Sequence, residues 1–336
     1  MGRLRANIVA HDLLLIGFHG WILAWGSLAG GASPDASLGR RLTLAVFVLT
    51  TITIVLVRAD VLPAGRFRGT LYRLVLIGSL PTSYFEIAAL QRTMQPELFD
   101  MQLWAIDRAL FGVTPAEWLV RINRVTVIEW FAFFYQSYYV ILPGFLLIPA
   151  FVERGVRLQE FLFAAAMVGV LGHASYTLVP GAGPYEAIGF SEPIRGGYWW
   201  SIVEETVRNE DALDIFPSLH TAMPLAFTLH LFRHRRRVPY RYLWPVLAFF
   251  AANIVVATML LRWHWGIDVV VGIALAAMAH VVSVRVARRE RRRGVADDRQ
   301  LVWEPVFPWQ RAPLRSPPAG RASSRFRNRR TSRRSR

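Results

Sequence analysis

Residues 215–272 read IFPSLHTAMPLAFTLHLFRHRRRVPYRYLWPVLAFFAANIVVATMLLRWHWGIDVVVG, and this stretch decides the fold. It opens on a polar cluster that ends in His220 and closes on a second cluster that runs from Arg262 to Asp268. Two apolar segments lie between the clusters and are joined by the basic turn 233–241. Because two consecutive spans return a chain to the membrane face that it left, we expect the two clusters to meet.

The composition of the whole chain also indicates a membrane protein. Of its 336 residues, 54% are apolar and 18% are charged, against about 25% charged residues in ordinary soluble domains. The chain has no cysteine, which excludes disulfide bonds and thiolate chemistry. Apolar runs of nearly 20 residues recur, each long enough to cross about 30 Å of hydrocarbon. We expect eight spans, at residues 13–29, 40–57, 74–90, 127–151, 161–179, 217–232, 244–261 and 265–284.

The segment between the third and fourth spans has a different pattern. Residues 91–126 mix charged side chains with apolar ones at helical spacing, and they are broken at Gly112 and Pro115. This pattern predicts two amphipathic helices that lie at the membrane interface. The predicted fold is therefore an all-α polytopic membrane protein, with one domain at 1–286, a catalytic core at about 126–286 and a tail at 287–336.

The net charge of +16 at pH 7 comes mostly from the tail. Seventeen arginines between residues 285 and 336 stand against four acidic residues, and Pro, Ser and Gly replace most apolar residues. This composition predicts a disordered cytoplasmic segment that binds anionic lipid headgroups, and no nucleic-acid partner is needed to explain it. Eight spans place both termini on the cytoplasmic side of the plasma (inner) membrane, and the two polar clusters then face outward.

His264 and Asp268 are four residues apart, so they share one face if the last helix has begun by His264. A carboxylate that accepts from one ring nitrogen fixes the tautomer and leaves the other nitrogen free to attack phosphorus. The alternative is a purely structural role, in which a buried His–Asp pair holds two helices together. Ionisable residues within spans are costly and are functional by default, which favours the catalytic interpretation.

His220 lies one turn into the sixth predicted span, behind Pro217 at the expected first helical position. The free amides of that turn and the Ser218 hydroxyl predict a cradle for an anion, and His220 there is placed to protonate a leaving alkoxide. The motif Pro-Ser-x-His is weak by itself. Its weight comes from the second histidine cluster, 44 residues later.

Three further positions are candidates for phosphate binding. Arg262 is next to the second cluster, where it either holds a phosphate oxygen or extends to the interface beside two tryptophans. The turn Gly183-Pro184-Tyr185 either closes over the site or is an ordinary loop turn. Arg195 is a possible charge partner on the same loop, and no His/carboxylate spacing there argues for a metal ion.

The segment FPSLHTA at 216–222, followed by HxxxDxxxG at 264–272, resembles the type 2 phosphatidic acid phosphatase (PAP2) superfamily. Within it, the wording FPSLH is similar to the inositolphosphotransferase branch of fungal inositol phosphorylceramide synthase and its bacterial relatives, and DRALFG at 107–112 resembles their interfacial helices. The resemblance implies a PAP2-type helix bundle and a phosphohistidine intermediate formed without metal or other cofactor. It makes His264 the nucleophile, Asp268 its partner and His220 the acid/base.

The chain departs from the classical phosphatases of the superfamily at two cationic positions. Gly183-Pro184-Tyr185 is the nearest counterpart of their Lys/Arg-Pro motif, and Thr258 stands where they carry an arginine. A phosphodiester carries one negative charge where a monoester carries about two, so a transferase needs fewer cations.

These observations predict a transferase that passes a phosphoryl head group from a phospholipid donor, with phosphatidylinositol as the example, to a lipid alcohol. The alternative is a phosphatase that hydrolyses a polyprenyl or diacylglycerol phosphate or pyrophosphate. A third class, a transporter or a scaffold with a relict site, is disfavoured by the intact His/His/Asp set and by the lack of a visible inverted repeat.

Overall fold

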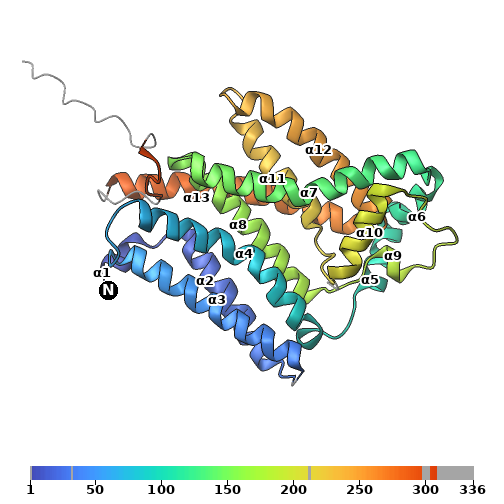
Figure 1. The fold of residues 1–336 in the computed structure, drawn as a ribbon, viewed down its shortest axis with the longest axis horizontal. Coiled ribbons are helices and arrows are strands. Elements are labelled where there is room, and N and C mark those ends of the chain that lie inside the picture. Colours follow the sequence, from blue (N-terminus) through green and yellow to red (C-terminus); the bar gives the residue numbers. More distant parts are fainter. Residues whose placement is uncertain (1, 32, 211–212, 297–302, 309–336) are drawn as a thin grey trace, which may run out of the picture.

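The computed structural model describes residues 2–31, 33–210, 213–296 and 303–308. These residues are helical without named strands, and one isolated bridge joins Gly181 to Asp214 (Figure 1). The elements are, in order, α1 (Gly2–Asn7), α2 (Ala10–Leu28), α3 (Pro34–Arg58), α4 (Arg66–Met94), α5 (Asp100–Phe111), α6 (Pro115–Leu119), η1 (Val120–Ile122), α7 (Val125–Val152), α8 (Gly155–Leu178), α9 (Pro184–Ala187), α10 (Tyr198–Glu210), α11 (Leu219–Arg233), α12 (Tyr240–Leu260) and α13 (Gly266–Ala296).

Six of the helices in the described residues are long and apolar enough to cross a membrane: α3, α4, α7, α8, α12 and α13. The other two predicted spans coincide with α2 and α11, which are not among the six, so the count of eight is not confirmed. Helix α11 has 15 residues, or about 22 Å at 1.5 Å per residue, which is shorter than a hydrocarbon core. Helix α2 buries His11, Asp12 and His19, which lower its apolar character.

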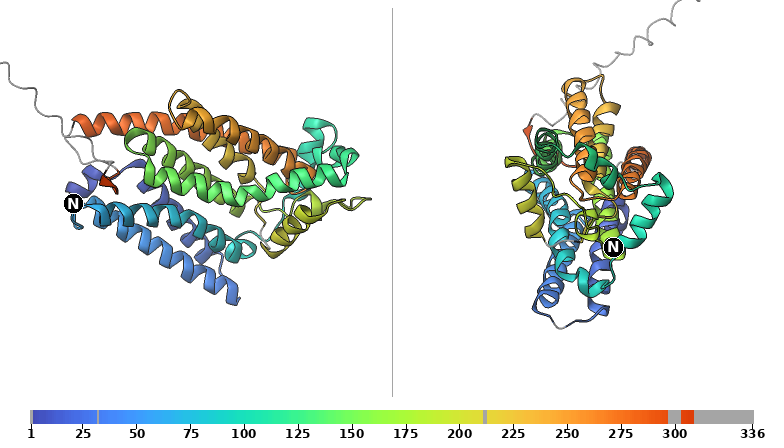
Figure 2. Two further views of the ribbon diagram at one scale, coloured as in Figure 1. Left: turned by 45° about the horizontal axis from the view of Figure 1, so that its top comes forward. Right: turned by 90° about the vertical axis from the view of Figure 1, so that its right-hand side faces the viewer.

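The centre of the bundle is built from α8, α11 and α13, which pack against one another pairwise. Helices α7 and α12 pack together beside α11, while α2, α3 and α4 form a second group that contacts α8 (Figure 2). Helix α3 exposes apolar side chains such as Leu44, Val48 and Ile52. An apolar surface of this kind suits lipid better than water.

The segment predicted to lie at the interface forms α5, α6 and η1, interrupted at Gly112 as expected. Helix α5 has the reverse of the burial pattern usual in soluble proteins. It buries the charged Asp100 and Asp107 and exposes the apolar Met101, Ile106 and Leu110. An apolar outer face fits a membrane surface, and the interfacial position of these helices stays a prediction.

The elements that flank the two polar clusters gather at one end of the bundle. Helices α5, α6, α9 and α10 lie there, whereas the N-terminus lies at the opposite end (Figures 1 and 2). We call these the loop end and the terminal end.

Part of the predicted tail packs on the bundle at the terminal end. Helix α13 continues past residue 286 to Ala296, because Glu290 accepts hydrogen bonds from the Ala10 N–H and the Gln159 side chain. Trp303 is buried and donates its ring N–H to the Gln159 side chain at 2.6 Å. Residues 297–302 and 309–336, most of the segment predicted to be disordered, lie outside the described residues.

Candidate active site

His264 lies in the short turn between α12 and α13, and the tryptophans on either side of it are buried in two different apolar clusters. Trp263 packs with Tyr185 and Trp200, and Trp265 packs with Leu103 and Ile215. Because large side chains before and after His264 enter different clusters, the backbone of the turn is fixed and the histidine ring is held between them. The residue is only 4% exposed.

One ring nitrogen of His264 is anchored. Its Nδ1 lies 2.9 Å from the carbonyl oxygen of Ile215 and 3.4 Å from Oδ2 of Asp268. A carbonyl oxygen only accepts, so Nδ1 carries the proton and Nε2 keeps its lone pair. The pairing of His264 with Asp268 expected from their spacing is therefore present, but the shorter contact is to a backbone carbonyl that no sequence pattern marks.

The surroundings of His264 keep its ring neutral near pH 7. Burial lowers the pKa of His264 from 6.5 to about 4, although the nearby charge of Asp214 and the hydrogen bond to Ile215 both oppose this shift. Desolvation disfavours the charged imidazolium, which is the physical cause. A neutral ring with a free Nε2 is the form that can act as a nucleophile.

His220 faces His264, with 5.9 Å between the two ring centroids. It stacks on Tyr135 at 4.6 Å and packs against Tyr138 at 4.1 Å. Its Nε2 is buried and has no hydrogen-bond partner among the described residues. A buried ring nitrogen without a partner costs free energy in the free protein, which is expected where a substrate supplies the missing partner.

The start of α11 differs in detail from the prediction. Ser218, not Pro217, precedes the first helical residue, and the Ser218 hydroxyl accepts from the Thr221 N–H at 3.2 Å as an N-cap. The prediction that Pro217 occupies the first helical position is wrong, because the serine side chain caps the helix one residue later. The Ser218 oxygen accepts in this cap while its hydroxyl hydrogen can still donate, so anion binding by Ser218 stays a prediction.

The two clusters are also joined through the backbone. The Ser218 N–H donates to the carbonyl oxygen of Asp268 at 3.1 Å. A Cβ on Gly272 would lie 2.7 Å from the Ser218 carbonyl oxygen. The glycine of the HxxxDxxxG motif therefore allows α13 to approach the start of α11, which brings His220 towards His264.

The turn at 183–185 closes over the His264 turn. Gly183 has a φ of +86°, and a Cβ there would lie 2.4 Å from the Trp263 carbonyl oxygen. Pro184 is buried at the start of α9, and the Tyr185 N–H donates to the Arg262 carbonyl oxygen at 2.8 Å. Of the two interpretations of this turn, close packing against the site is the one observed, and phosphate binding by it stays a prediction.

The two candidate arginines are engaged by the loop between α9 and α10. The guanidinium of Arg262 donates to the Glu192 carbonyl oxygen at 2.9 Å and lies 3.9 Å from the centre of the Phe190 ring. The Arg195 side chain pairs with the Glu192 carboxylate at 3.2 Å and is 62% exposed. Phosphate binding by either arginine stays a prediction.

Two carboxylates that were not assigned to the site hold it in place. Asp107 accepts from the backbone N–H groups of Gly266 and Ile267, both at 2.8 Å, and so caps the start of α13. Asp100 accepts from the Gly183 N–H at 2.8 Å and from the Trp265 ring N–H at 3.2 Å. Their spacing of seven residues, two helical turns, was the available indication that they share a face.

Among the described residues, one group of side chains has ligand atoms close enough to hold a metal ion, and it is not this site. Glu160, His230 and His234 form it, at the other end of α11 from His220.

The family model described as the PAP2 superfamily matches residues 101–282. No curated protein and no solved structure matches the chain in the same comparisons. The matched region covers more than half of the chain and includes α5, His220, His264 and Asp268. The chain belongs to the PAP2 superfamily, whose members are generally phosphatases or phosphotransferases that act on lipid phosphates.

Proposed function

We propose that the chain is a membrane-embedded phosphotransferase that moves a phosphoryl head group from a phospholipid to a lipid alcohol, with a phosphohistidine intermediate on His264. One observation carries the proposal: Nδ1 of His264 is anchored 2.9 Å from the Ile215 carbonyl oxygen, which leaves Nε2 free, and the His220 ring lies 5.9 Å away. A phosphoryl group bound beside both rings can be attacked by His264 while His220 exchanges a proton with its leaving or entering oxygen.

In the first step, Nε2 of His264 attacks phosphorus and the phosphorus–oxygen bond to diacylglycerol breaks. Protonated His220 gives its proton to the departing alkoxide, and the negative charge of the bound phosphate favours that protonated ring. In the second step, neutral His220 takes the proton of the acceptor alcohol, whose oxygen attacks phosphorus and releases His264. Asp268 and the Ile215 carbonyl stabilise the positive charge that develops on His264.

The supply of cations supports a transferase over a monoesterase. The Arg262 and Arg195 side chains are both engaged with Glu192. A phosphodiester donor presents one negative charge, which the two histidines and the first-turn amides of α11 can balance. Phosphatidylinositol is such a donor, and the segment FPSLH at 216–220, which is similar to the inositolphosphotransferase branch, supports phosphoinositol as the transferred group.

We further propose that the loop end faces the outside of the plasma (inner) membrane and that both termini are cytoplasmic. The basic turn 233–241 and the arginine-rich C-terminal residues support this orientation. In it, the tail binds anionic lipid headgroups and the apolar outer faces of the helices contact lipid.

The test uses purified protein in mixed micelles with inositol-labelled phosphatidylinositol and a lipid extract. We expect the wild type to make a new labelled lipid and His264→Ala to lose at least about 1,000-fold of that activity, because the covalent step is absent. His173→Ala is the control, since His173 is a buried histidine that bonds to Ser83. If the protein releases phosphate from a lipid monophosphate supplied alone and transfers no head group, it is a phosphatase and the transferase proposal is wrong. Equal activity in wild type and His264→Ala would remove His264 from the mechanism.

A further inference from the structure

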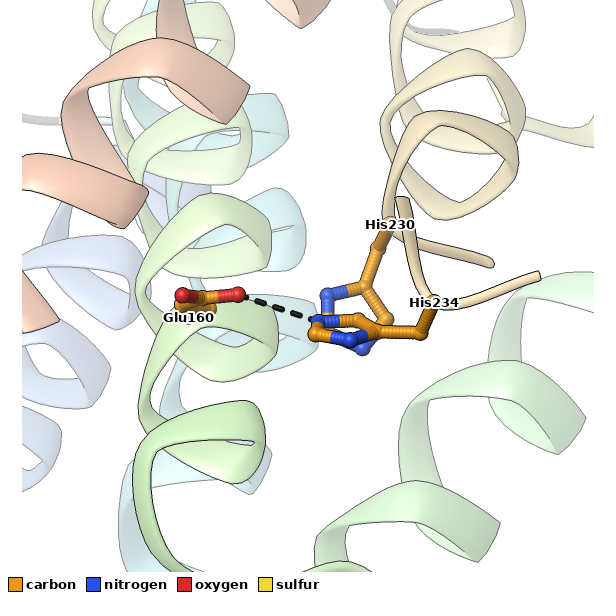
Figure 3. Close-up of side chains that lie close together, drawn as sticks. All are labelled: Glu160, His230 and His234. Atoms are coloured by element: carbon orange, nitrogen blue, oxygen red, sulfur yellow. Dashed lines mark hydrogen bonds and ion pairs between the residues drawn. The ribbon is translucent and has the colours of Figure 1, made fainter. Parts of the chain in front are cut away.

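A second cluster of titratable side chains lies where α8 begins and α11 ends. Glu160 comes from the first turns of α8, His230 from the last turn of α11, and His234 from the residue that caps α11 (Figure 3). The ligand atoms of the three side chains all lie within 4.8 Å of one another. His220 is ten residues before His230 on the same helix, about 15 Å away at 1.5 Å per residue, so this cluster is separate from the active site.

The sequence explains why the two histidines converge. His230 and His234 are four residues apart at the end of α11, so they lie on one face, and their ring centroids are 4.8 Å apart. Glu160 reaches the same point from α8, where its Oε2 lies 3.1 Å from Nε2 of His234. Two imidazoles and one carboxylate from two helices therefore point towards one spot, as Figure 3 shows.

An ion pair accounts for only part of this cluster. The Arg233 guanidinium donates to Glu160 at 3.1 Å, so the carboxylate has a counter-charge and His234 has an acceptor. His230 gains nothing from that pair. It is 3% exposed, and its Nε2 has no hydrogen-bond partner among the described residues. An unpartnered ring nitrogen in a dry site is costly, and a metal ion is the partner that would use its lone pair.

We propose that Glu160, His230 and His234 bind a divalent transition-metal ion, for which zinc is the best fit. Two imidazole nitrogens and one carboxylate oxygen suit zinc, whereas calcium and magnesium prefer oxygen ligands alone. Ligand atoms around tetrahedral zinc are about 3.4 Å apart, so small side-chain rotations from the observed spacing suffice. The ion replaces the His234–Glu160 hydrogen bond, and Arg233 stays on the carboxylate as an outer partner that orients it.

The neighbours of the cluster limit what the ion can do. The Phe161 ring packs on His230 at 5.1 Å, and the Tyr240 ring lies 5.9 Å from His234. These rings pack on the two histidines from α8 and α12, and water is the fourth ligand that completes a tetrahedral site. The ion therefore links the start of α8 to the end of α11, the helix that carries His220 at its other end. Its role is to fix this helix pair, independently of the reaction proposed for His264.

The experiment measures zinc binding on the full-length protein in detergent, after removal of any affinity tag and stripping with a chelator. After zinc is added back and the excess is removed, we expect one zinc ion per chain by elemental analysis. Added zinc should also raise Tm, because an ion that binds only the folded state stabilises it. His230→Ala, His234→Ala and Glu160→Gln should each weaken zinc binding at least about tenfold. His220→Ala is the matched control, a histidine on the same helix, and should bind zinc like the wild type.

Cobalt provides a test that needs no variant. Cobalt(II) bound to wild-type protein should give the intense visible bands of a four-coordinate site, and zinc should displace them. Less than one zinc per three chains in the wild type, or six-coordinate cobalt bands only, would overturn the proposal. So would zinc binding that survives His230→Ala but is lost in His220→Ala, which would place the metal at the active site.

Discussion

At the scale of single residues, the central feature is that His264 is both buried and anchored through one nitrogen. Its Nδ1 contacts the Ile215 carbonyl at 2.9 Å and Asp268 at 3.4 Å, so the proton and the free lone pair have fixed positions. Burial lowers the pKa of His264 to about 4, and the charge of Asp214 works against that shift. His264, the proposed nucleophile, is therefore neutral over the whole physiological range.

This pKa predicts the acid side of the pH profile. His264 must be unprotonated to attack. We therefore expect kcat/KM to fall only as the pH approaches 4, and not near 6.5, the ordinary pKa of histidine. Asp214→Asn removes a charge that raises the pKa of His264, so it should move this limb to lower pH. The measurement is kcat/KM in micelles from pH 4 to 8. Glu205→Gln, at an exposed position on α10, should leave the limb in place, and an acid limb centred near 6.5 in the wild type would contradict the assignment.

The sequence identifies the candidate catalytic residues more readily than it identifies the groups that hold them. His220, His264 and Asp268 stand out because ionisable side chains are rare in apolar segments. The Ile215 carbonyl is invisible in a sequence, because every residue has one and only the tertiary fold selects it. The Ser218 hydroxyl fits both an anion site and a helix cap. The fold uses its oxygen as a cap, and anion binding by its hydrogen stays a prediction.

At the scale of elements, α5 supports the active site although it contributes no catalytic group. Its buried face carries Asp100 and Asp107, which hold the 182–183 turn and the start of α13, respectively. The sequence locates this helix but does not assign its two carboxylates to the site. A sequence pattern does not mark them as buried, because only the folded structure brings the backbone N–H groups that satisfy them.

Asp107→Asn tests this support. The two N–H groups of Gly266 and Ile267 donate to different oxygens of Asp107. In asparagine one of these atoms is an amide nitrogen, which only donates, so one buried N–H loses its present acceptor at a cost of about 1–3 kcal/mol. We expect a lower Tm and a fall in kcat of about tenfold to 100-fold, since small displacements of His264 are costly, with little change in KM. Kinetics and thermal unfolding on the same preparations check this. Glu97→Gln, an exposed neighbour before α5, is the control, and a KM effect without a kcat effect would place Asp107 against the substrate instead.

At the scale of the whole molecule, the candidate site and the N-terminus lie at opposite ends of the bundle. The α12–α13 turn and the start of α11 meet beneath α5, α9 and α10 at the loop end, as the helical hairpin in the sequence predicts. The terminal end carries the N-terminus and the buried Trp303. The hairpin was predictable because its geometry depends only on the lengths of the two apolar segments. The packing of residues 303–308 was not predictable, because the tryptophan there stands in a basic, proline-containing segment without a periodic apolar pattern.

The two ends give the last prediction, on orientation. The chain has no cysteine, so single cysteines can be introduced without a background. Ser191→Cys places a thiol on an exposed loop at the loop end, whereas Ala64→Cys and Arg236→Cys place one in exposed basic turns. Because arginine-rich loops stay cytoplasmic, we expect a membrane-impermeant maleimide to label only Ser191→Cys in intact cells, and the other two only after permeabilisation. The reverse pattern would invert the topology and place the active site on the cytoplasmic face, with the chemistry at His264 unchanged. Labelling of all three in intact cells would mean that the spans between them do not cross the membrane as proposed.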